Sequence, residues 1–404
     1  MNARLDTIIT DSNLVWDESF EKLTDKFSVK LSDNTIKELL DNKNNLEQNN
    51  ITLFPILKNE ILKIKTILLN EHGFIIIDGK SFEGFSKKEV KSIYIIISKF
   101  LGILIPQNIK KEILVEVKDE HKSMKTGGRY HQTKEGGSCH TDSPQWKNAP
   151  DFIGLCCIHP AKIGGVNKYI SAYTIHNLFI EQNIGLLEIL YDNFYFDKRG
   201  EFKSGEDPTI FEPIIKYEDK KLTFRYLRTY IDQGYKVENK ELSDDQLKSL
   251  ELLDKFLENP KNVVEYTLQK YDMTFFNNNW IIHGRTNFED YEDLEKRREA
   301  KSKLSHQPTG LNDFYQEMDL GTMYFTIIKQ RKRESREKYD GPKSKLSLIS
   351  KDQINNLEWL RENFRNPHDH SENDIEEEFS DMTIQKIKIF IHEIRAAISN
   401  LKHI

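Results

Sequence analysis

Gly137-Ser-Cys-His140-Thr-Asp142 is the stretch that decides the fold, together with the run Trp280-Ile-Ile-His283-Gly-Arg-Thr286 far downstream. On a β-strand, residues i and i+2 point to the same face, so His140 and Asp142 can hold one metal ion while the residue between them points away. His283 offers a second imidazole from an apolar, strand-like segment. The two segments together predict a metal site built on strands.

Two histidines and one carboxylate on one face of an octahedral ion form the facial triad of non-haem Fe(II) oxygenases, which leaves three positions open. Taken singly, a histidine in an apolar strand is more often a hydrogen-bonded core residue, and His-x-Asp can be a turn pair. In this order and spacing they predict an oxygen-using iron enzyme. We interpret the neighbouring histidines as structural residues; they are His131, His159 and His176.

Composition excludes several classes of protein. The 404 residues are 37% apolar and 31% charged, and 65 acidic residues are intermixed with 59 basic ones, so no basic field would steer the protein onto nucleic acid. The N-terminus lacks the apolar region of a signal peptide, and the longest apolar stretch, 93–105, falls short of the ~20 residues of a membrane span. Three cysteines without CxxC spacing argue against a disulfide framework or a thiolate zinc site. We expect a cytoplasmic protein with no membrane or nucleic-acid partner.

Short β-branched runs separated by Gly, Pro and Asn follow one another from residue 111 onward, which favours a jelly roll or barrel with the ligands among its strands. Runs typical of strands are 72–79, 113–117, 152–158, 168–171, 222–226, 263–266 and 273–276. Apolar residues at helical spacing predict helices within 1–70 and over 85–104, 174–193 and 244–257. The last of these begins with a capping box, Ser243-Asp-Asp-Gln246.

The C-terminal part differs in composition. A charge run over 329–338 indicates a solvated surface, and 344–404 predicts two helices around an acidic loop. In the last helix, apolar residues recur every three or four positions from Ile384 to Leu401, a stripe that must dock on the core or on another chain. A homo-oligomer formed through these helices is therefore one expectation.

The segments 126–172 and around His283 resemble the TauD/TfdA, clavaminate-synthase-like branch of the Fe(II)/2-oxoglutarate dioxygenases, over about residues 70 to 330. The features that carry the resemblance are Gly137-Ser-Cys-His140-Thr-Asp142, the turn Pro160-Ala-x-x-Gly164-Gly165, Asn277-Asn-Asn-Trp-Ile-Ile-His283-Gly-Arg-Thr-Asn-Phe288, and Gln107. A lone His-x-Asp is a weak signal, whereas the three motifs in this order are a much stronger one.

The resemblance implies a double-stranded β-helix (a jelly roll), here a mostly β core flanked by N- and C-terminal helical segments. It implies that His140, Asp142 and His283 bind Fe(II), that 2-oxoglutarate chelates the iron, and that O2 takes the last open site. The substrate would be a small polar metabolite, such as an amino acid or derivative, that is hydroxylated or desaturated. Because Asp142 stands where halogenating relatives have Gly or Ala, no iron position is freed for halide.

The implied organisation has three parts: an N-terminal helical extension over 1–70, the β-helix domain over 71–330 with a lid inserted at about 291–320, and a charged linker with helices over 331–404. Residues beside the expected pocket could meet a substrate carboxylate, although a surface or structural role is at least as common for each. They are Tyr130, Trp146, Arg225, Arg228 and Arg285.

Two positions depart from the family pattern. Asn167 stands where relatives place a threonine whose hydroxyl meets 2-oxoglutarate, and an amide can replace it as a donor. Arg297 and Arg298 are the candidates for the arginine that binds the distal carboxylate of 2-oxoglutarate. The surrounding stretch 291–307, however, is rich in Glu, Lys and Arg at i,i+4 spacing and predicts a helix rather than the strand that the family uses.

If 291–320 is a lid, the next strand-like run, 323–328, would replace the family's last strand and the arginine positions would fall at Thr322 and Thr326. Another base would then hold the carboxylate; the candidates are Arg331, Lys329 and Arg225. Two further hypotheses follow from this departure: an iron oxidase of the same fold that does not use 2-oxoglutarate, and a non-catalytic jelly-roll binding protein.

Overall fold

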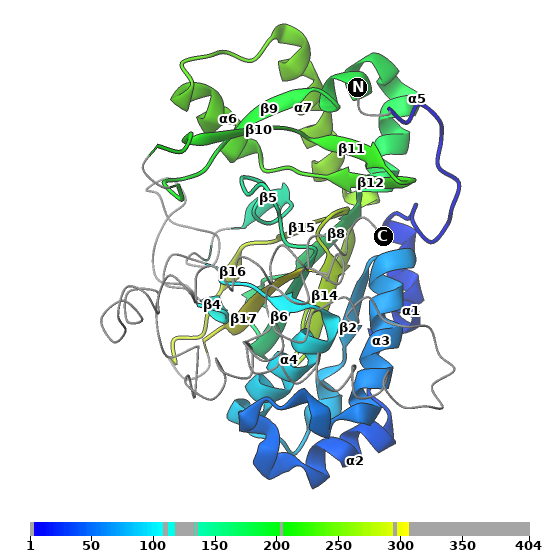
Figure 1. Cartoon of the computed structure of the whole chain (residues 1–404). Helices are drawn as coiled ribbons and strands as arrows, with labels where there is room; N and C mark the ends of the chain where they lie inside the picture. Colours follow the sequence, from blue (N-terminus) through cyan, green and yellow to red (C-terminus); the bar gives the residue numbers. More distant parts are fainter. Residues whose placement is uncertain are drawn as a thin grey trace, which may run out of the picture. The chain divides into compact units, whose positions relative to one another are not determined.

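The computed structural model describes residues 4–107, 112–117, 134, 136–202, 205–293 and 297–306, and the structural statements below concern these residues (Figure 1). They belong to one compact unit, Met1–Gln307. Among them, no helix combines the length and apolar character needed to cross a membrane.

Seven strands form the larger sheet, in the order β1 (Ser28–Val29), β2 (Phe74–Ile77), β14 (Met273–Asn277), β6 (Phe152–His159), β17 (Glu299–His306) and β3 (Ile103–Leu104), with β4 (Val115–Val117) also paired to β17. All pairs are antiparallel except β1 with β2. The β2, β6 and β14 runs are the apolar segments that the sequence predicts as buried strands.

Four strands form the smaller, antiparallel sheet, in the order β13 (Val264–Tyr266), β8 (Asn167–Ser171), β15 (Ile281–Arg285) and β5 (Gly137–His140). The two sheets pack face to face. Tyr169 of β8 stacks on Phe74 of β2 with ring centroids 4.6 Å apart, and its hydroxyl donates a hydrogen bond to Thr274 of β14 at 2.9 Å. The main apolar core therefore lies between the sheets.

Helices from the N-terminal part cover the other face of the larger sheet. Side chains such as Leu57 and Ile61 of α3 and Ile93 of α4 form a second core cluster with Ile75 and Phe275 of the sheet. The elements of this part are η1 (Glu18–Leu23), α1 (Thr24–Phe27), α2 (Asp33–Asp41), η2 (Lys43–Gln48), η3 (Ile51–Leu53), α3 (Pro55–Asn70), η4 (Gly79–Phe82) and α4 (Lys87–Leu101). The helices predicted within 1–70 and over 85–104 are thus present.

A helical and hairpin segment is inserted between β8 and β13. Its elements are α5 (Ala172–Leu190), the hairpin β9 (Asn193–Asp197) and β10 (Thr209–Pro213), the hairpin β11 (Ile215–Glu218) and β12 (Lys221–Phe224), α6 (Arg228–Val237), α7 (Asp244–Glu258) and η7 (Pro260–Asn262). The start of α7 is the predicted capping box, with both the Ser243 and the Gln246 side chain bonded to main-chain N–H groups. Two short strands, β7 (Ile163–Gly164) and β16 (Phe288–Glu289), pair near the smaller sheet.

The helix predicted over 291–307 is wrong, because Glu299–His306 is strand β17, paired with β6 along most of its length. Its charges make their ion pairs across to α4 instead of along a helix: Glu299 contacts Lys87 and Lys91 of α4, and also Lys301. Pairing with a neighbouring strand therefore outweighs the intrinsic helix preference of this stretch. Residues 299–306 of the expected lid are thus a core strand, and residues 294–296, 307–320 and 323–328 lie outside the described residues.

Substitution of Phe74 tests the packing of the core between the sheets. Phe74 is fully buried and contacts the rings of Phe27 and Tyr169. We expect Phe74→Ala to lower the free energy of unfolding by about 3–5 kcal/mol, because it removes a large ring and leaves a cavity. The matched control is Leu62→Ala, whose side chain is 43% exposed and should cost less than about 1 kcal/mol. Urea denaturation followed by circular dichroism gives both values; equal losses would contradict this packing.

Candidate metal centre

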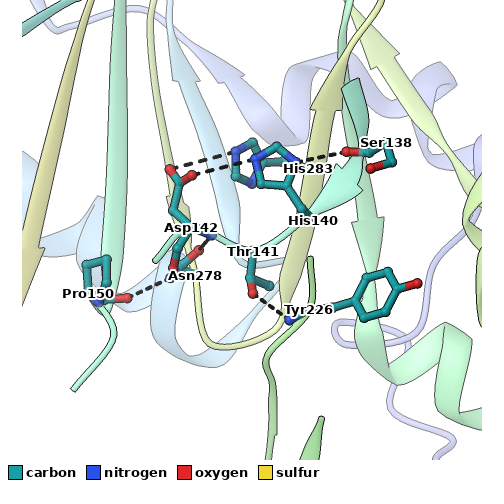
Figure 2. Close-up of polar contacts among 8 residues, drawn as sticks. All are labelled: Ser138, His140, Thr141, Asp142, Pro150, Tyr226, Asn278 and His283. Atoms are coloured by element: carbon teal, nitrogen blue, oxygen red, sulfur yellow. Dashed lines mark hydrogen bonds and ion pairs between the residues drawn. The ribbon is translucent and has the colours of Figure 1, made fainter. Parts of the chain in front are cut away.

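The two histidines of the predicted site lie opposite each other on neighbouring strands. His140 ends β5 and His283 lies in β15, and the two are direct partners in the antiparallel register (Figure 2). Directly opposed residues share a face of the sheet, and the ring centroids are 4.6 Å apart. His283 is also opposite Tyr169 and packs on Phe276 of β14 at 4.5 Å, so this face is the one turned toward the larger sheet.

Close approach of β5 and β15 depends on Gly284. A Cβ at this position would lie 3.0 Å from Sγ of Cys139, nearer than side chains normally pack. Cys139 points away from the site into the core, where burial raises the pKa of its thiol to about 11. The Gly of His283-Gly-Arg285 therefore lets the two ligand strands pair, and Cys139 has the packing role that strand alternation predicts.

Asp142 completes the site from the loop that follows β5. Its Oδ1 lies 3.6 Å from His140 Nε2, and its Oδ2 lies 3.9 Å from His283 Nε2. All three ligand atoms lie within 4.8 Å of one another, and in the described part of the chain these residues are the one such cluster of His, Cys, Asp or Glu. Both distances are less than twice a metal–ligand bond of about 2.1 Å, so one ion can touch each pair.

Both imidazoles can present a lone pair to a cation. His140 Nδ1 lies 2.8 Å from the Ser138 carbonyl; when Nδ1 carries the ring proton it donates to this oxygen, and the lone pair is then on Nε2, which faces Asp142. Burial lowers the pKa of His283 to about 4, against the opposing effect of Asp142, so this ring is neutral at physiological pH. Two imidazoles and one carboxylate are a donor set suited to a divalent cation.

Thr141 points away from the ligands, as the strand alternation predicts. Its main-chain N–H donates to the Tyr226 carbonyl, and its Oγ1 accepts from the Tyr226 N–H, both at 2.9 Å (Figure 2). Tyr226 in turn contacts Asp254, which also pairs with Arg228. The middle residue of the motif thus anchors it to the inserted segment.

The Pro160-Ala-x-x-Gly164-Gly165 turn has a backbone conformation that favours glycine at its last two positions. Both glycines have positive φ, +74° and +69°, and a Cβ on Gly164 would lie only 2.2 Å from the Asn287 carbonyl oxygen. Asn167 follows at the start of β8, directly opposite Arg285, and its amide donates to the Tyr266 carbonyl at 3.4 Å.

The two candidate arginines have different environments in the structure. Arg298 is only 6% exposed, lies over the Phe288 ring at 5.0 Å, and keeps Nη1 buried without a hydrogen-bond partner. Burial lowers the pKa of its guanidinium. Arg297 instead donates from Nε to the Tyr291 carbonyl in an exposed loop at 3.3 Å. Arg298 therefore offers an unsatisfied buried cation, and it lies beside the glycine turn, with Nε 3.7 Å from a Cβ built on Gly165.

Most of the other pocket candidates have structural partners. Arg225 donates to the carbonyls of Pro144 and Trp146, Arg228 pairs with Asp232, and Arg285 lies over the Phe288 ring at 4.6 Å. Trp146 donates to Glu201, Gln107 donates to the carbonyls of Ile113 and Ser302, and His176 contacts the Leu5 carbonyl. Tyr130 and His131 lie outside the described residues.

Sequence reasoning missed Asn278, whose buried side chain bonds to Asp142. The signal was present as three consecutive asparagines before a ligand strand, Asn277-Asn278-Asn279. Buried amides need hydrogen-bond partners, so such a run marks a turn that is bonded to something nearby.

Comparison with known proteins identifies the family. Residues 43–300 match the family described as taurine catabolism dioxygenase TauD, TfdA family. The chain belongs to the TauD/TfdA family. A curated TauD/TfdA relative, FR-33289 synthase from Streptomyces rubellomurinus (strain ATCC 31215), is 26% identical over 291 residues, which is 69% of this chain and 84% of the relative.

Solved structures of two oxygenases share the fold. Asparagine oxygenase in complex with Fe(II), 2S,3S-3-hydroxyasparagine and succinate superposes with a TM-score of 0.57 at 12% identity, over 69% of this chain and 93% of the other. The non-heme iron oxygenase OrfP in complex with Fe and alpha-ketoglutaric acid gives 0.52 at 13% identity, over 69% and 94%.

Membership of the TauD/TfdA family confirms the resemblance seen in the sequence: this protein is an Fe(II)/2-oxoglutarate-dependent dioxygenase. The hypotheses of a non-catalytic binding protein and of an oxidase that dispenses with 2-oxoglutarate are therefore set aside. The residues present fit both groups. Two histidines with a carboxylate suit Fe(II), and the buried Arg298 guanidinium, whose Nη1 has no hydrogen-bond partner, suits a carboxylate.

Metal titration tests the three ligands. Under anaerobic conditions the wild-type protein should bind about one Fe(II) per chain, and His140→Ala or His283→Ala should weaken binding by more than about 100-fold, because even the partners of ligands contribute 10–100-fold. His159→Ala, at the end of β6 and outside the cluster, is the control and should bind normally. Unchanged affinity in both ligand variants, measured by calorimetry, would refute the assignment.

Proposed function

We propose that His140, Asp142 and His283 hold the iron and that Arg298 binds the distal carboxylate of 2-oxoglutarate. The observation that carries this proposal is the convergence of two histidines on the inner face of the smaller sheet with Asp142 from the following loop, and a buried guanidinium beside the glycine turn whose Nη1 has no hydrogen-bond partner. A bidentate arginine–carboxylate pair would satisfy that guanidinium. Asn167, on the same strand as Tyr169 and two residues before it, lines the same face and is proposed to assist.

We further propose that the two facing sheets are the halves of a double-stranded β-helix. The antiparallel pairing, the face-to-face contact of Tyr169 with Phe74, and the ligands on the inner face support this arrangement. The division into an extension over 1–70, the oxygenase domain over 71–330 and a C-terminal part over 331–404, and the cytoplasmic location, stay predictions from the sequence. The C-terminal helices proposed for oligomer contacts lie outside the described residues.

Iron with 2-oxoglutarate and O2 supplies an oxidant that can remove a hydrogen atom from an unactivated C–H bond. The residues of this chain would bind these groups and shield them from water. Asp142 and the two histidines would hold the ion, while Phe276 packs on His283 and on Tyr169 and helps to exclude water from the ligands. With a carboxylate retained at position 142, hydroxylation or desaturation is the proposed outcome.

The proposed substrate is a small polar metabolite such as an amino acid or a derivative. Both structural neighbours are recorded with hydroxylated amino acids, 3-hydroxyasparagine for asparagine oxygenase and (3S)-hydroxy-L-Arg for OrfP. In this chain, Arg285 lies two residues after His283 on β15 and so shares its face of the sheet. A guanidinium there suits the carboxylate of such a substrate.

Arg298→Leu tests the cosubstrate assignment. We expect the KM for 2-oxoglutarate to rise at least about 30-fold, roughly 2 kcal/mol, because a buried ion pair loses one partner. Iron affinity should stay at the wild-type value. Arg297→Leu is the matched control, since that side chain bonds to an exposed carbonyl. Succinate release measured against 2-oxoglutarate concentration decides the point; a larger effect of Arg297→Leu than of Arg298→Leu would reverse the assignment.

A substrate screen tests the proposed class. Purified protein with Fe(II), ascorbate, 2-oxoglutarate and O2 should release more succinate with one or a few amino acids or amino-acid derivatives than without any. Mass spectrometry should show the gain of one oxygen or the loss of two hydrogens in that compound. If amino acids and derivatives leave succinate release at its uncoupled level while other metabolites raise it, the proposed class is wrong and the enzyme class stands.

A further inference from the structure

Asn278 lies in the turn between β14 and β15 and is 2% exposed. Its side-chain oxygen accepts a hydrogen bond from the Asp142 N–H at 2.8 Å. Its side-chain nitrogen donates to the Asp142 carbonyl at 3.0 Å and to the Pro150 carbonyl at 2.9 Å (Figure 2). The side-chain amide of Asn278 therefore makes three hydrogen bonds, one through its oxygen and two through its nitrogen. Two of the three are with Asp142.

The position of Asp142 explains why such an amide is needed. Strand β5 ends at His140, so Asp142 lies just beyond the ladder that aligns His140 with His283. The next residue, Ser143, has φ of +52°, so the chain turns sharply immediately after the ligand. A neighbouring strand holds the main chain of a residue through hydrogen bonds to its N–H and carbonyl groups. The Asn278 side chain bonds both of these groups of Asp142 and so replaces a strand partner.

Other contacts hold the residues on either side of Asp142. Thr141 exchanges two hydrogen bonds with Tyr226, and Arg225 donates to the carbonyls of Pro144 and Trp146. The Pro150 bond closes the far end of the same loop onto Asn278. Asn278 thus contacts the main chain of the ligand directly, whereas the other anchors act on its flanks.

Asn278 also links two ligands through the chain. It precedes His283 by five residues, and the turn that carries it leads directly into β15. A displacement of this turn would therefore move His283 and, through the amide, Asp142 together. The turn therefore connects the main chain of Asp142 to the strand that carries His283.

We infer that Asn278 is a positioning residue for the metal ligand Asp142: it directs the carboxylate toward His140 and His283 before any ion arrives. The inference rests on the proposed metal site. Residues that bond to metal ligands typically contribute about 10- to 100-fold in metal affinity, and we expect Asn278, which bonds the main chain of Asp142, to fall in this range. Asn278 does not touch the iron, so its effect must pass through Asp142.

A double-mutant cycle with Co(II), titrated anaerobically, tests this route. Asn278→Ala should weaken binding about 10- to 100-fold in the wild-type background. In an Asp142→Ala background, where the two histidines bind the ion weakly, the same substitution should have no further effect, because the residue it positions is gone. The visible spectrum of bound Co(II) should also change in Asn278→Ala, since the carboxylate no longer meets the ion in the same geometry.

Asn279→Ala is the matched control, because this next asparagine bonds through its amide to the Asp151 carboxylate and not to Asp142. It should leave Co(II) affinity unchanged. Thermal unfolding of the metal-free proteins checks folding, and Asn278→Ser, which leaves a small polar group in the site, replaces Asn278→Ala if the latter does not fold.

The outcomes separate the inference from the proposed function. Equal affinity of Asn278→Ala and wild type, or an equal loss in the presence and absence of Asp142, would overturn the positioning role and leave the metal site intact. Failure of the wild-type protein to bind either Co(II) or Fe(II) would overturn the proposed site, and the inference with it. A loss confined to the background that retains Asp142 supports both.

Discussion

The cross-strand pair of His140 with His283 is the constraint on which the rest of the structure depends. A metal ion requires its ligand atoms to be placed within a few tenths of an ångström, and an antiparallel ladder fixes opposed side chains on one face at short distance. The register of β5 on β15, the glycine at position 284 and the buried Cys139 on the opposite face of β5 are all compatible with this pairing. The larger sheet then encloses the face on which the two rings lie.

A ladder can place only the ligands that lie on it. Asp142 comes after the end of β5, so its position depends on side chains instead of on strand pairing. Asn278 of the β14–β15 turn bonds the main chain of Asp142, and Arg225, just after β12 in the inserted segment, holds the loop that follows it. The helical insertion between β8 and β13 thus packs against the core. It is also connected to the proposed site, through its contacts with the loop that carries Asp142.

Local patterns predicted the parts of this protein that local physics determines. The His140-x-Asp142 spacing, the capping box at Ser243 and the glycines of the turn at 164 and 165 act over a few residues, and each was found where the sequence placed it. Strand β17 was missed because its Glu and Lys residues are typical of an exposed helix. Pairing with β3, β4 and β6 and ion pairs with the lysines of α4 make an extended conformation favourable there.

The choice between Arg297 and Arg298 could not be made from the sequence, because it depends on which side chain the fold buries. Under the proposed assignment, the site holds one carboxylate, Asp142, whose side chain is 32% exposed, and one buried guanidinium, Arg298, before anything binds. A divalent ion together with dianionic 2-oxoglutarate adds no net charge, so each of these two charges gains an opposite partner. A buried guanidinium with an unmet donor costs about 1–3 kcal/mol, and binding of the cosubstrate would recover it. Iron and 2-oxoglutarate should therefore favour one another's binding electrostatically. Because Arg298 would pair with the distal carboxylate, this coupling should require a cosubstrate with a second carboxylate.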